Sequence, residues 1–348
     1  VEHGARIIRL DAVAFLWKTS GTTCLHLKQT HQVIKFYRDV LSIVAPHVIL
    51  LTETNVPHEE NISYFGDGDE AHMIYQFSLP SLLADALIQE DARPLRRWLL
   101  YLDAPLPGTT FFNFTASHDG IGIRPLEGLV PWERVAALVT ATEESGGQIS
   151  VRQTPDGNDI PYELNVTYRD LLGTNQDLIV DRFILSQAVM LSLAGIPGIY
   201  FHSLVGSGND ISGMEESGIP RRINRQKYSW DELSHVLADK GSLQFEIFNR
   251  YRSLVCIRTQ QGAFHPNGDQ VVLDIDNRHV LGFSRTNPDK TESIIVLYNF
   301  SCKRQTIRIK NNLKHLGTDL MTNEQVNLSR SVTLAPLMFR WVKLNVSA

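Results

Sequence analysis

Short apolar runs alternate with helix-like segments up to about residue 260, and this alternation constrains the fold more than any other feature. The apolar runs are continuous, which is typical of strands buried on both faces of a sheet. They lie at residues 5–13, 47–55, 71–79, 109–119 and 198–206. Segments with helical periodicity lie between them, at residues 30–46, 81–91, 93–102, 131–145 and 177–194. The pattern predicts an α/β fold with a parallel sheet covered by helices on both faces.

The pattern changes at about residue 262. After a helical segment near 242–259, short strands follow one another with turn residues between them, at residues 270–276, 279–286, 293–301, 305–310 and 332–344. We therefore predict two domains, an α/β domain at 1–261 and an antiparallel β domain at 262–348. A closed (β/α)8 barrel needs eight strand–helix units, whereas the first domain has about four or five. Part of such a barrel would be missing from the front of the chain.

Composition limits the classes of protein and of partner. A formal net charge of −5 and 43% hydrophobic residues over 348 residues suit a soluble globular protein of about two domains. The chain has no long basic run, so we expect no nucleic-acid partner. Cys24, Cys256 and Cys302 are too few and too scattered for a disulfide framework or a metal site, which favours a reducing, cytoplasmic environment.

The most apolar window, residues 183–201, raises the question of a membrane span. Ser186, Gln187, Gly195 and Pro197 interrupt it, so we interpret it as a buried helix followed by a buried strand. The first residues carry charges and lead directly into a strand pattern, which does not resemble a signal peptide. We therefore expect no membrane partner.

Ionisable side chains follow the predicted strands and carry the candidate chemistry. Arg9 and Asp11 lie two residues apart near the end of the first strand, so their side chains share a face. Glu53 closes the second strand, and His118 and Asp119 close the run at 109–119. Because the carboxyl ends of parallel barrel strands meet at one mouth, we expect these groups to lie together.

Three carboxylates at such a mouth suit glycoside chemistry. One ionised carboxylate attacks the anomeric carbon, a second and protonated carboxyl group donates to the leaving oxygen, and a third group stabilises the oxocarbenium-like state. In a retaining enzyme the first two groups are roughly 5–5.5 Å apart. Arg9 would keep Asp11 ionised by direct pairing.

Each signal also has a plainer interpretation. A single arginine–aspartate pair on a strand is more often a structural salt bridge, and "TET" at 52–54 is more often only the end of a strand. The dipeptide "HD" at 118–119 arises readily by chance. Their joint order and position, rather than any single motif, favour an active site.

Three segments resemble sequence blocks of the α-amylase superfamily, glycoside hydrolase family 13: "RIIRLDAVAF", "LLTETN" and "FFNFTASHDGIG". Further segments resemble the sucrose phosphorylase group of that family, at residues 56–80, 118–131, 162–168 and 208–228. The resemblance covers nearly the whole chain. It implies that residues 1–261 hold strands 4–8 of a (β/α)8 barrel with their helices, followed by the β domain.

The resemblance also implies roles, position by position. Asp11 matches the nucleophile, Glu53 the general acid/base and Asp119 the transition-state stabiliser. Arg9 and His118 match residues that hold the glucosyl unit. Arg225 matches an arginine near the same sugar. No cofactor and no metal are implied.

The implied reaction transfers an α-glucosyl unit from an α-glucoside to inorganic phosphate and gives α-D-glucose 1-phosphate with retention. A phosphorylase must bind a dianion, which requires cationic side chains near the mouth. The candidates are Arg221 and Arg222 in the segment "RRINR", and Arg124 near Asp119. A solvated basic turn is the alternative for the first two. The segments "RPLEGLVP" and "INRQKY" are nearer to the glucosylglycerate phosphorylase branch than to ordinary sucrose phosphorylases.

The chain departs from the family at its front, where family members carry about three further strand–helix units. We therefore expect a fragment of a longer protein, with an exposed apolar surface where those strands belong. Two alternatives stay open: a hydrolase or transglucosidase with the same carboxylates, and an inactive chain that only binds sugar or a partner. The sequence does not indicate an oligomeric state.

Overall fold

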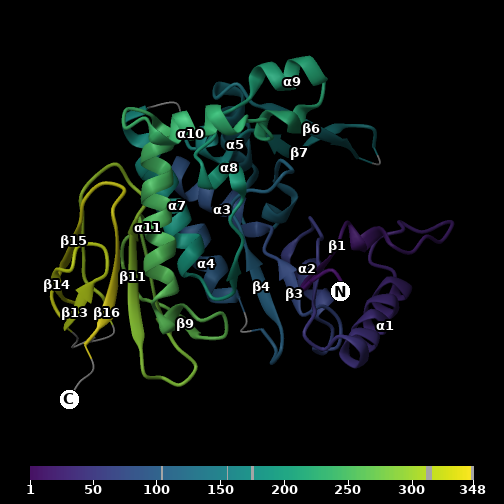
Figure 1. The fold of residues 1–348 in the computed structure, drawn as a ribbon, viewed down its shortest axis with the longest axis horizontal. Coiled ribbons are helices and arrows are strands. Elements are labelled where there is room, and N and C mark those ends of the chain that lie inside the picture. The colour runs from purple at the N-terminus through teal and green to yellow at the C-terminus, as the bar shows by residue number, and fades with distance from the viewer. Residues whose placement is uncertain (103–104, 155, 174–175, 311–315, 346–348) are drawn as a thin grey trace.

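The computed structural model describes residues 1–102, 105–154, 156–173, 176–310 and 316–345. Its central feature is a sheet of parallel strands in the order β1, β2, β3, β4 and β8 (Figure 1). Their bounds are β1 Ile7–Leu10, β2 Ile49–Thr52, β3 Met73–Tyr75, β4 Thr110–Asn113 and β8 Ile196–Pro197. Helices follow these strands as the sequence predicts. The longer ones are α1 Lys28–Val44, α3 Ser78–Ile88, α4 Arg93–Tyr101, α5 Trp132–Glu144, α7 Gln176–Ser192 and α11 Leu243–Thr259.

The pairing register decides which side chains share a face of this sheet. Arg9 pairs with Leu51 in β2, so both point to the same side. On the opposite side, Ile74 and Phe111 are buried in one cluster with Ile34 of α1. Helix α1 therefore covers one face of the sheet, and the Arg9 side chain lies on the opposite face.

The strand predicted at 198–206 is wrong. β8 ends at Pro197, and residues 201–204 form the short helix α8 (Phe201–Leu204). The Gly198 N–H still donates to the Asn113 carbonyl at 2.7 Å, but a Cβ at Gly198 would lie 2.2 Å from the Phe112 ring. The chain passes closely over that ring and then enters α8, so part of an apolar run that was predicted as a strand is helical.

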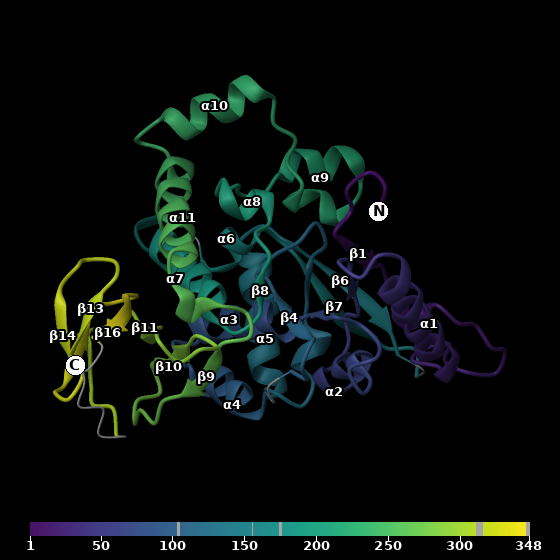
Figure 2. The same cartoon turned by 60° about the horizontal axis from the view of Figure 1, so that its bottom comes forward.

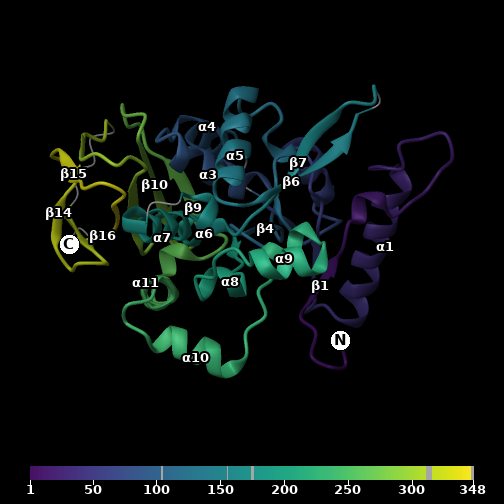
Figure 3. The ribbon, with the colours of Figure 1, turned by 90° about the horizontal axis from the view of Figure 1, so that it is seen from above.

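The stretch at 146–176, predicted as irregular, contains a hairpin. Strands β6 (Gln148–Gln153) and β7 (Asp159–Asn165) pair with each other, and β7 also pairs with β5 (Ile121–Gly122). Figure 3 shows this hairpin projecting from the body of the molecule. Gly157 in its turn has a φ of +82°, a conformation that glycine adopts readily. β7 thereby runs directly beside the segment that follows His118 and Asp119.

The remaining helices follow the carboxyl ends of the strands or precede α11 in the chain. They are α2 His58–Ile62, α6 Tyr168–Leu171, α9 Ile211–Ser217 and α10 Trp230–Ala238. Between α9 and α10, residues Pro220–Asn224 form a 3₁₀ helix. A capping box between Ser229 and Glu232 starts α10, which projects outward in Figure 2.

The C-terminal part is antiparallel, as predicted. One sheet has the order β14, β13, β16, β11, β10 and β9, and β12 pairs with β15. The bounds are β9 Asp269–Val272, β10 Val280–Thr286, β11 Ser293–Asn299, β12 Gln305–Ile307, β13 Leu316–Asp319, β14 Gln325–Asn327, β15 Val332–Leu334 and β16 Phe339–Leu344. Strands β13 and β14 were not among the predicted strands. A small core of its own, which includes Ile295 and Leu297, lies within this part.

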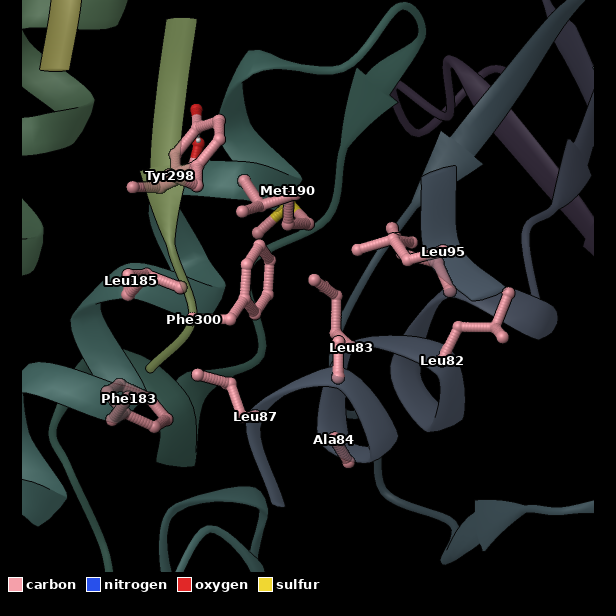
Figure 4. Close-up of a cluster of buried hydrophobic side chains, with 14 of the residues drawn as sticks. Leu82, Leu83, Ala84, Leu87, Leu95, Phe183, Leu185, Met190, Tyr298 and Phe300 are labelled. Carbon is pink, nitrogen blue, oxygen red and sulfur yellow. Dashed lines mark hydrogen bonds between the residues drawn. The ribbon is translucent and has the colours of Figure 1, made fainter. Parts of the chain in front are cut away.

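The main hydrophobic core extends across the predicted boundary at 261/262. Figure 4 shows Leu83 and Leu87 of α3 close to Phe300, with Met190 of α7 beside it. Tyr298 of β11 joins the same cluster and is fully buried. The α/β part and the β part therefore share one core, and the exact domain boundary stays a prediction.

The molecule is open at the end opposite the β domain. Among the described strands, β1 pairs only with β2, and α1 lies at the far side from the C-terminal strands in all three ribbon views (Figures 1–3). The outer side of α1 exposes apolar side chains, among them Phe36, Ile43 and Val44 at 62%, 81% and 70%. This is an exposed apolar surface of the kind that the sequence predicts. Among the described residues, no helix is both long and apolar enough to span a membrane.

Candidate active site

The Arg9 guanidinium lies between two carboxylates. Its Nη1 atom pairs with Oδ1 of Asp11, and its Nη2 atom is 3.9 Å from Oε2 of Glu53. The same guanidinium lies over the Tyr75 ring, 5.6 Å from the ring centre. Arg9 thus brings the ends of β1 and β2 together, and the aromatic ring of β3 supports it from below.

A tight turn directly after Asp11 completes this corner. Ala12 has φ +44° and ψ +38°, in the left-handed region that a non-glycine residue adopts at a cost. Its N–H donates a 2.8 Å hydrogen bond to Oε2 of Glu53. The turn therefore gives Glu53 a fixed backbone donor and leaves the Asp11 side chain projecting outward, 74% exposed.

Glu53 is in a different environment from Asp11. Its side chain is only 12% exposed, and burial raises its pKa above the ordinary value. The Ala12 N–H and Arg9 lower that pKa, whereas the negative charges of Asp119 and Asp11 raise it. The net direction is upward. A carboxyl group with a raised pKa beside an exposed, arginine-paired carboxylate is the arrangement that a general acid and a nucleophile require.

Asp119 lies six residues beyond the end of β4, beside two arginines and a histidine. Arg221 donates from Nη1 to Oδ1 at 2.8 Å, and Nη2 of Arg225 is 3.6 Å from the same oxygen. Nε2 of His118 is 3.6 Å from Oδ2. Asn224 also donates to the Asp119 carbonyl oxygen at 2.7 Å, so the 3₁₀ helix Pro220–Asn224 is tied to this segment.

Tyr75 connects the two groups of charges. Burial raises the pKa of its hydroxyl, Arg9 lowers it, and the charges of Glu53 and Asp119 raise it further. The three predicted catalytic carboxylates thus share one electrostatic environment on the side of the sheet toward which Arg9 points.

Comparison with known proteins finds similar phosphorylases. No family model matches the chain. The glucosylglycerate phosphorylase of Escherichia coli is 41% identical over 344 residues, which covers 98% of this chain and 60% of that protein. The corresponding enzyme of Spirochaeta thermophila is 46% identical over 304 residues, 86% of this chain and 51% of that protein.

A solved structure is similar over most of the chain. The sucrose 6F-phosphate phosphorylase from Thermoanaerobacter thermosaccharolyticum superposes with a TM-score of 0.74 at 22% identity, over 93% of this chain and 60% of that chain. The chain belongs to the sucrose and glucosylglycerate phosphorylase group of glycoside hydrolase family 13. Its parallel strands form part of a (β/α)8 barrel, followed by the antiparallel β part. The chain spans between half and three fifths of the curated relatives' length, 51% and 60% in the two cases above.

The sequence indicates Arg221 and Arg222 together as candidates for binding phosphate, but the structure gives them different surroundings. Arg221 faces Asp119, as described above. Arg222 instead pairs with Asp210, the N-cap residue of α9, and donates to the Arg225 carbonyl oxygen. Arg222 therefore holds the loop that carries Arg225, and none of its hydrogen bonds reaches a predicted catalytic carboxylate.

Arg124 lies on another side of the site. Its Nη2 atom is 3.3 Å from Oε2 of Glu60 in α2, and the same oxygen is 3.0 Å from Nε2 of His26. The Nε atom of Arg124 is buried and has no hydrogen-bond partner. Burial and Glu163 raise the pKa of Tyr162, while Arg221 and Arg124 both lower it.

Glu163 is the residue that sequence reasoning missed. It lies in β7 with a side chain that is 2% exposed and accepts two hydrogen bonds from Arg221, at 2.8 and 2.6 Å. The segment "YELNVTY" at 162–168 carried only the family resemblance, and its glutamate was given no role. The hairpin that places it was not predicted.

A cavity of about 470 Å³ lies elsewhere, between α4, β4 and residues 266–271. None of the predicted site residues lines it. The candidate active site is instead an open corner in this chain, because Asp11 is largely exposed. Among the described residues, no group of His, Cys, Asp and Glu side chains is arranged to hold a metal ion.

Proposed function

We propose that the protein carries out retaining phosphorolysis of an α-glucoside. The glucosyl unit passes from the glucoside to Asp11 and then to inorganic phosphate, which gives α-D-glucose 1-phosphate. The observation that carries this proposal is the position of Arg9 between exposed Asp11 and buried Glu53, whose pKa is raised. Asp11 then serves as the ionised nucleophile and Glu53 as the protonated acid.

In the first step an Asp11 oxygen attacks the anomeric carbon while Glu53 protonates the leaving oxygen, so the freed acceptor departs as an alcohol. In the second step the Glu53 carboxylate removes a proton from phosphate, and a phosphate oxygen displaces Asp11. Asp119 stabilises the positive charge that develops on the sugar in both steps. His118 and Arg225, which flank Asp119, hold the glucosyl hydroxyl groups.

The acceptor subsite needs cations that face Glu53. We assign this role to Arg221, whose Nη1 atom is 2.8 Å from Oδ1 of Asp119, and to Arg124, whose buried Nε atom has no hydrogen-bond partner among the described residues. The contacts of Arg222 with Asp210 and a backbone carbonyl do not support the same role for Arg222. Glycerate is the proposed natural acceptor, since the relatives at 41% and 46% identity are glucosylglycerate phosphorylases.

An assay on the full-length protein tests the proposal. Glucosylglycerate incubated with phosphate should give α-glucose 1-phosphate and glycerate in equal amounts, and omission of phosphate should stop the reaction. Glucose released at the same rate without phosphate would instead show a hydrolase. Faster turnover of sucrose than of glucosylglycerate would move the assignment to sucrose phosphorylase.

Hydrolysis is the second candidate because Asp11 is 74% exposed in this chain, so water could reach a glucosyl–enzyme there. The same assay on residues 1–348 alone tests it. A chain that binds glucoside without turnover would support the binding-only alternative. The cytoplasmic location also stays a proposal. It is supported by Cys24, Cys256 and Cys302, which are all free thiols.

A further inference from the structure

Glu163 is a buried charge that the proposed steps do not use. Its side chain is 2% exposed, and its carboxylate forms a two-point contact with Arg221, from Nε at 2.8 Å and from Nη2 at 2.6 Å. A buried carboxylate is costly unless it is fully paired, and this geometry supplies the pairing. Its hydrogen bonds raise the pKa of Arg221 more than Asp119 does.

The backbone fixes Glu163 beside the segment that carries Asp119. Glu163 pairs with Gly122 in the register of β5 and β7. A Cβ built on Gly120 would lie 2.5 Å from the Glu163 Cγ atom and 2.7 Å from the Leu164 carbonyl oxygen. Glycine at position 120 therefore allows β7 to approach the residue next to Asp119 with no intervening side chain.

The guanidinium group transmits this position to Asp119. It is planar, so a carboxylate held on its Nε and Nη2 atoms also determines where Nη1 points. Nη1 donates to Oδ1 of Asp119 at 2.8 Å. With Arg225 3.6 Å from the same oxygen, the two carboxylates and the two arginines balance in charge. Loss of the Glu163 charge would leave a net positive charge around Asp119.

We propose that Glu163 is a positioning residue that acts through Arg221: it aims the guanidinium at Asp119 and cancels its charge. Asp119 then keeps its negative charge effective toward the oxocarbenium-like transition state. The same cancellation weakens the attraction of Arg221 for phosphate. Glu163 therefore lowers the affinity for phosphate and raises the rate of glucosyl transfer. This inference rests on the proposed role of Asp119.

The test is a double-mutant cycle in the full-length protein with Glu163→Gln, Arg221→Ala and the double variant. α-D-Glucosyl fluoride is the donor, because fluoride release reports glucosyl-enzyme formation whether phosphate or water is the acceptor. We expect Glu163→Gln to slow fluoride release about 10- to 100-fold and to lower the KM for inorganic phosphate several-fold. In the Arg221→Ala background, Glu163→Gln should have little further effect.

Additive effects of the two substitutions, or fluoride release at the wild-type rate in Glu163→Gln, would overturn the proposal. A raised KM for phosphate would also overturn it, because loss of the Glu163 charge should strengthen the attraction of Arg221 for phosphate. If Glu163→Gln does not fold, the same cycle is run with Glu163→Asp. This variant keeps the charge but shortens the side chain, so its fluoride release should be slower than that of wild type by less than the 10- to 100-fold expected for Glu163→Gln. A wild-type protein that releases fluoride without any dependence on phosphate would refute the proposed phosphorolysis. The rates of fluoride release in the single and double variants would still test the coupling of Glu163 to Arg221.

Glu127→Gln is the matched control. Glu127 pairs with Arg152 of the β6–β7 hairpin at 3.2 Å, its side chain is 52% exposed, and within the described part of the chain its carboxylate pairs with none of the proposed site residues. This substitution removes a carboxylate of the same type at the surface. It should leave both fluoride release and the KM for phosphate unchanged.

Discussion

The backbone N–H of Ala12 donates a 2.8 Å hydrogen bond to the Glu53 carboxylate, although the two residues are 41 positions apart. The bond joins the loops that follow β1 and β2. It also gives the buried Glu53 carboxylate a donor that cannot move independently of Asp11. The spacing between the proposed nucleophile and the proposed acid is therefore set by the backbone as well as by Arg9.

Glu53→Gln should have opposite effects on activity and on stability. For a glucoside whose leaving oxygen needs a proton, we expect kcat to fall about 10²- to 10⁴-fold in the full-length protein. α-D-Glucosyl fluoride needs little help from an acid, so its glucosyl-enzyme formation should be much less affected. Comparable losses with both donors would show that Glu53 is not the general acid.

The stability of Glu53→Gln should depend on pH in a defined direction. The folded-state pKa of Glu53 is raised, so its contribution to stability is fully present below the unfolded pKa and is lost as pH rises through the folded pKa. Glutamine has no such loss. The variant should therefore gain free energy of unfolding relative to wild type as pH rises toward 7, and urea unfolding at several pH values measures this. A difference that shrinks with rising pH would contradict the burial argument.

Asp11→Asn should abolish the covalent intermediate. Removal of the nucleophile should lower kcat by about three orders of magnitude or more, because Glu53 and the sugar-binding groups cannot replace the covalent step. Mass spectrometry of wild type quenched during turnover of α-D-glucosyl fluoride should detect a glucosyl adduct on the peptide that contains Asp11. An adduct on the peptide that contains Asp119 would reassign the nucleophile.

Arg124→Ala should discriminate between acceptors. If Arg124 faces the acceptor anion, its loss should weaken the binding of phosphate and of glycerate about 10- to 100-fold. Fluoride release from α-D-glucosyl fluoride should stay nearly unchanged. Arg152→Ala, which removes an arginine paired with Glu127 at the surface, is the control. Equal losses with neutral and anionic acceptors would show that Arg124 is structural.

Tyr298→Phe should test the shared core. The Tyr298 hydroxyl accepts from Nε1 of Trp341 at 2.8 Å and donates to the Ala188 carbonyl at 3.0 Å. Its loss leaves buried polar groups without this partner, so we expect a cost of about 1–3 kcal/mol in the free energy of unfolding. Tyr101→Phe, whose residue is 76% exposed, should cost far less.

Tyr298→Phe should also unfold in one transition, because α7 and β11 share the main core. Tryptophan fluorescence and far-ultraviolet circular dichroism should give the same urea midpoint. Separate midpoints would support two independently stable domains divided near residue 262.

The sequence alone predicted the features that depend on neighbours along the chain. Continuous apolar runs predict buried strands, and Arg9 in β1 pairs with Asp11, which lies one residue beyond the end of that strand. Glu53 directly follows β2, as the pattern predicts, whereas Asp119 lies six residues beyond the end of β4, because the predicted strand at 109–119 ends at Asn113. The helices at 28–44, 132–144 and 243–259 also lie close to their predicted bounds, because 3.6-residue periodicity is a local property.

Only the tertiary structure decided the contacts between distant segments. Arg221 and Glu163 are 58 residues apart, and their pairing depends on a hairpin and on the absence of a side chain at Gly120. Within the apolar run at 198–206, residues 201–204 form the helix α8, and Gly198 passes closely over Phe112. Periodicity records which residues prefer to be buried, whereas the partner that buries or pairs each of them is set by the packing of the whole chain.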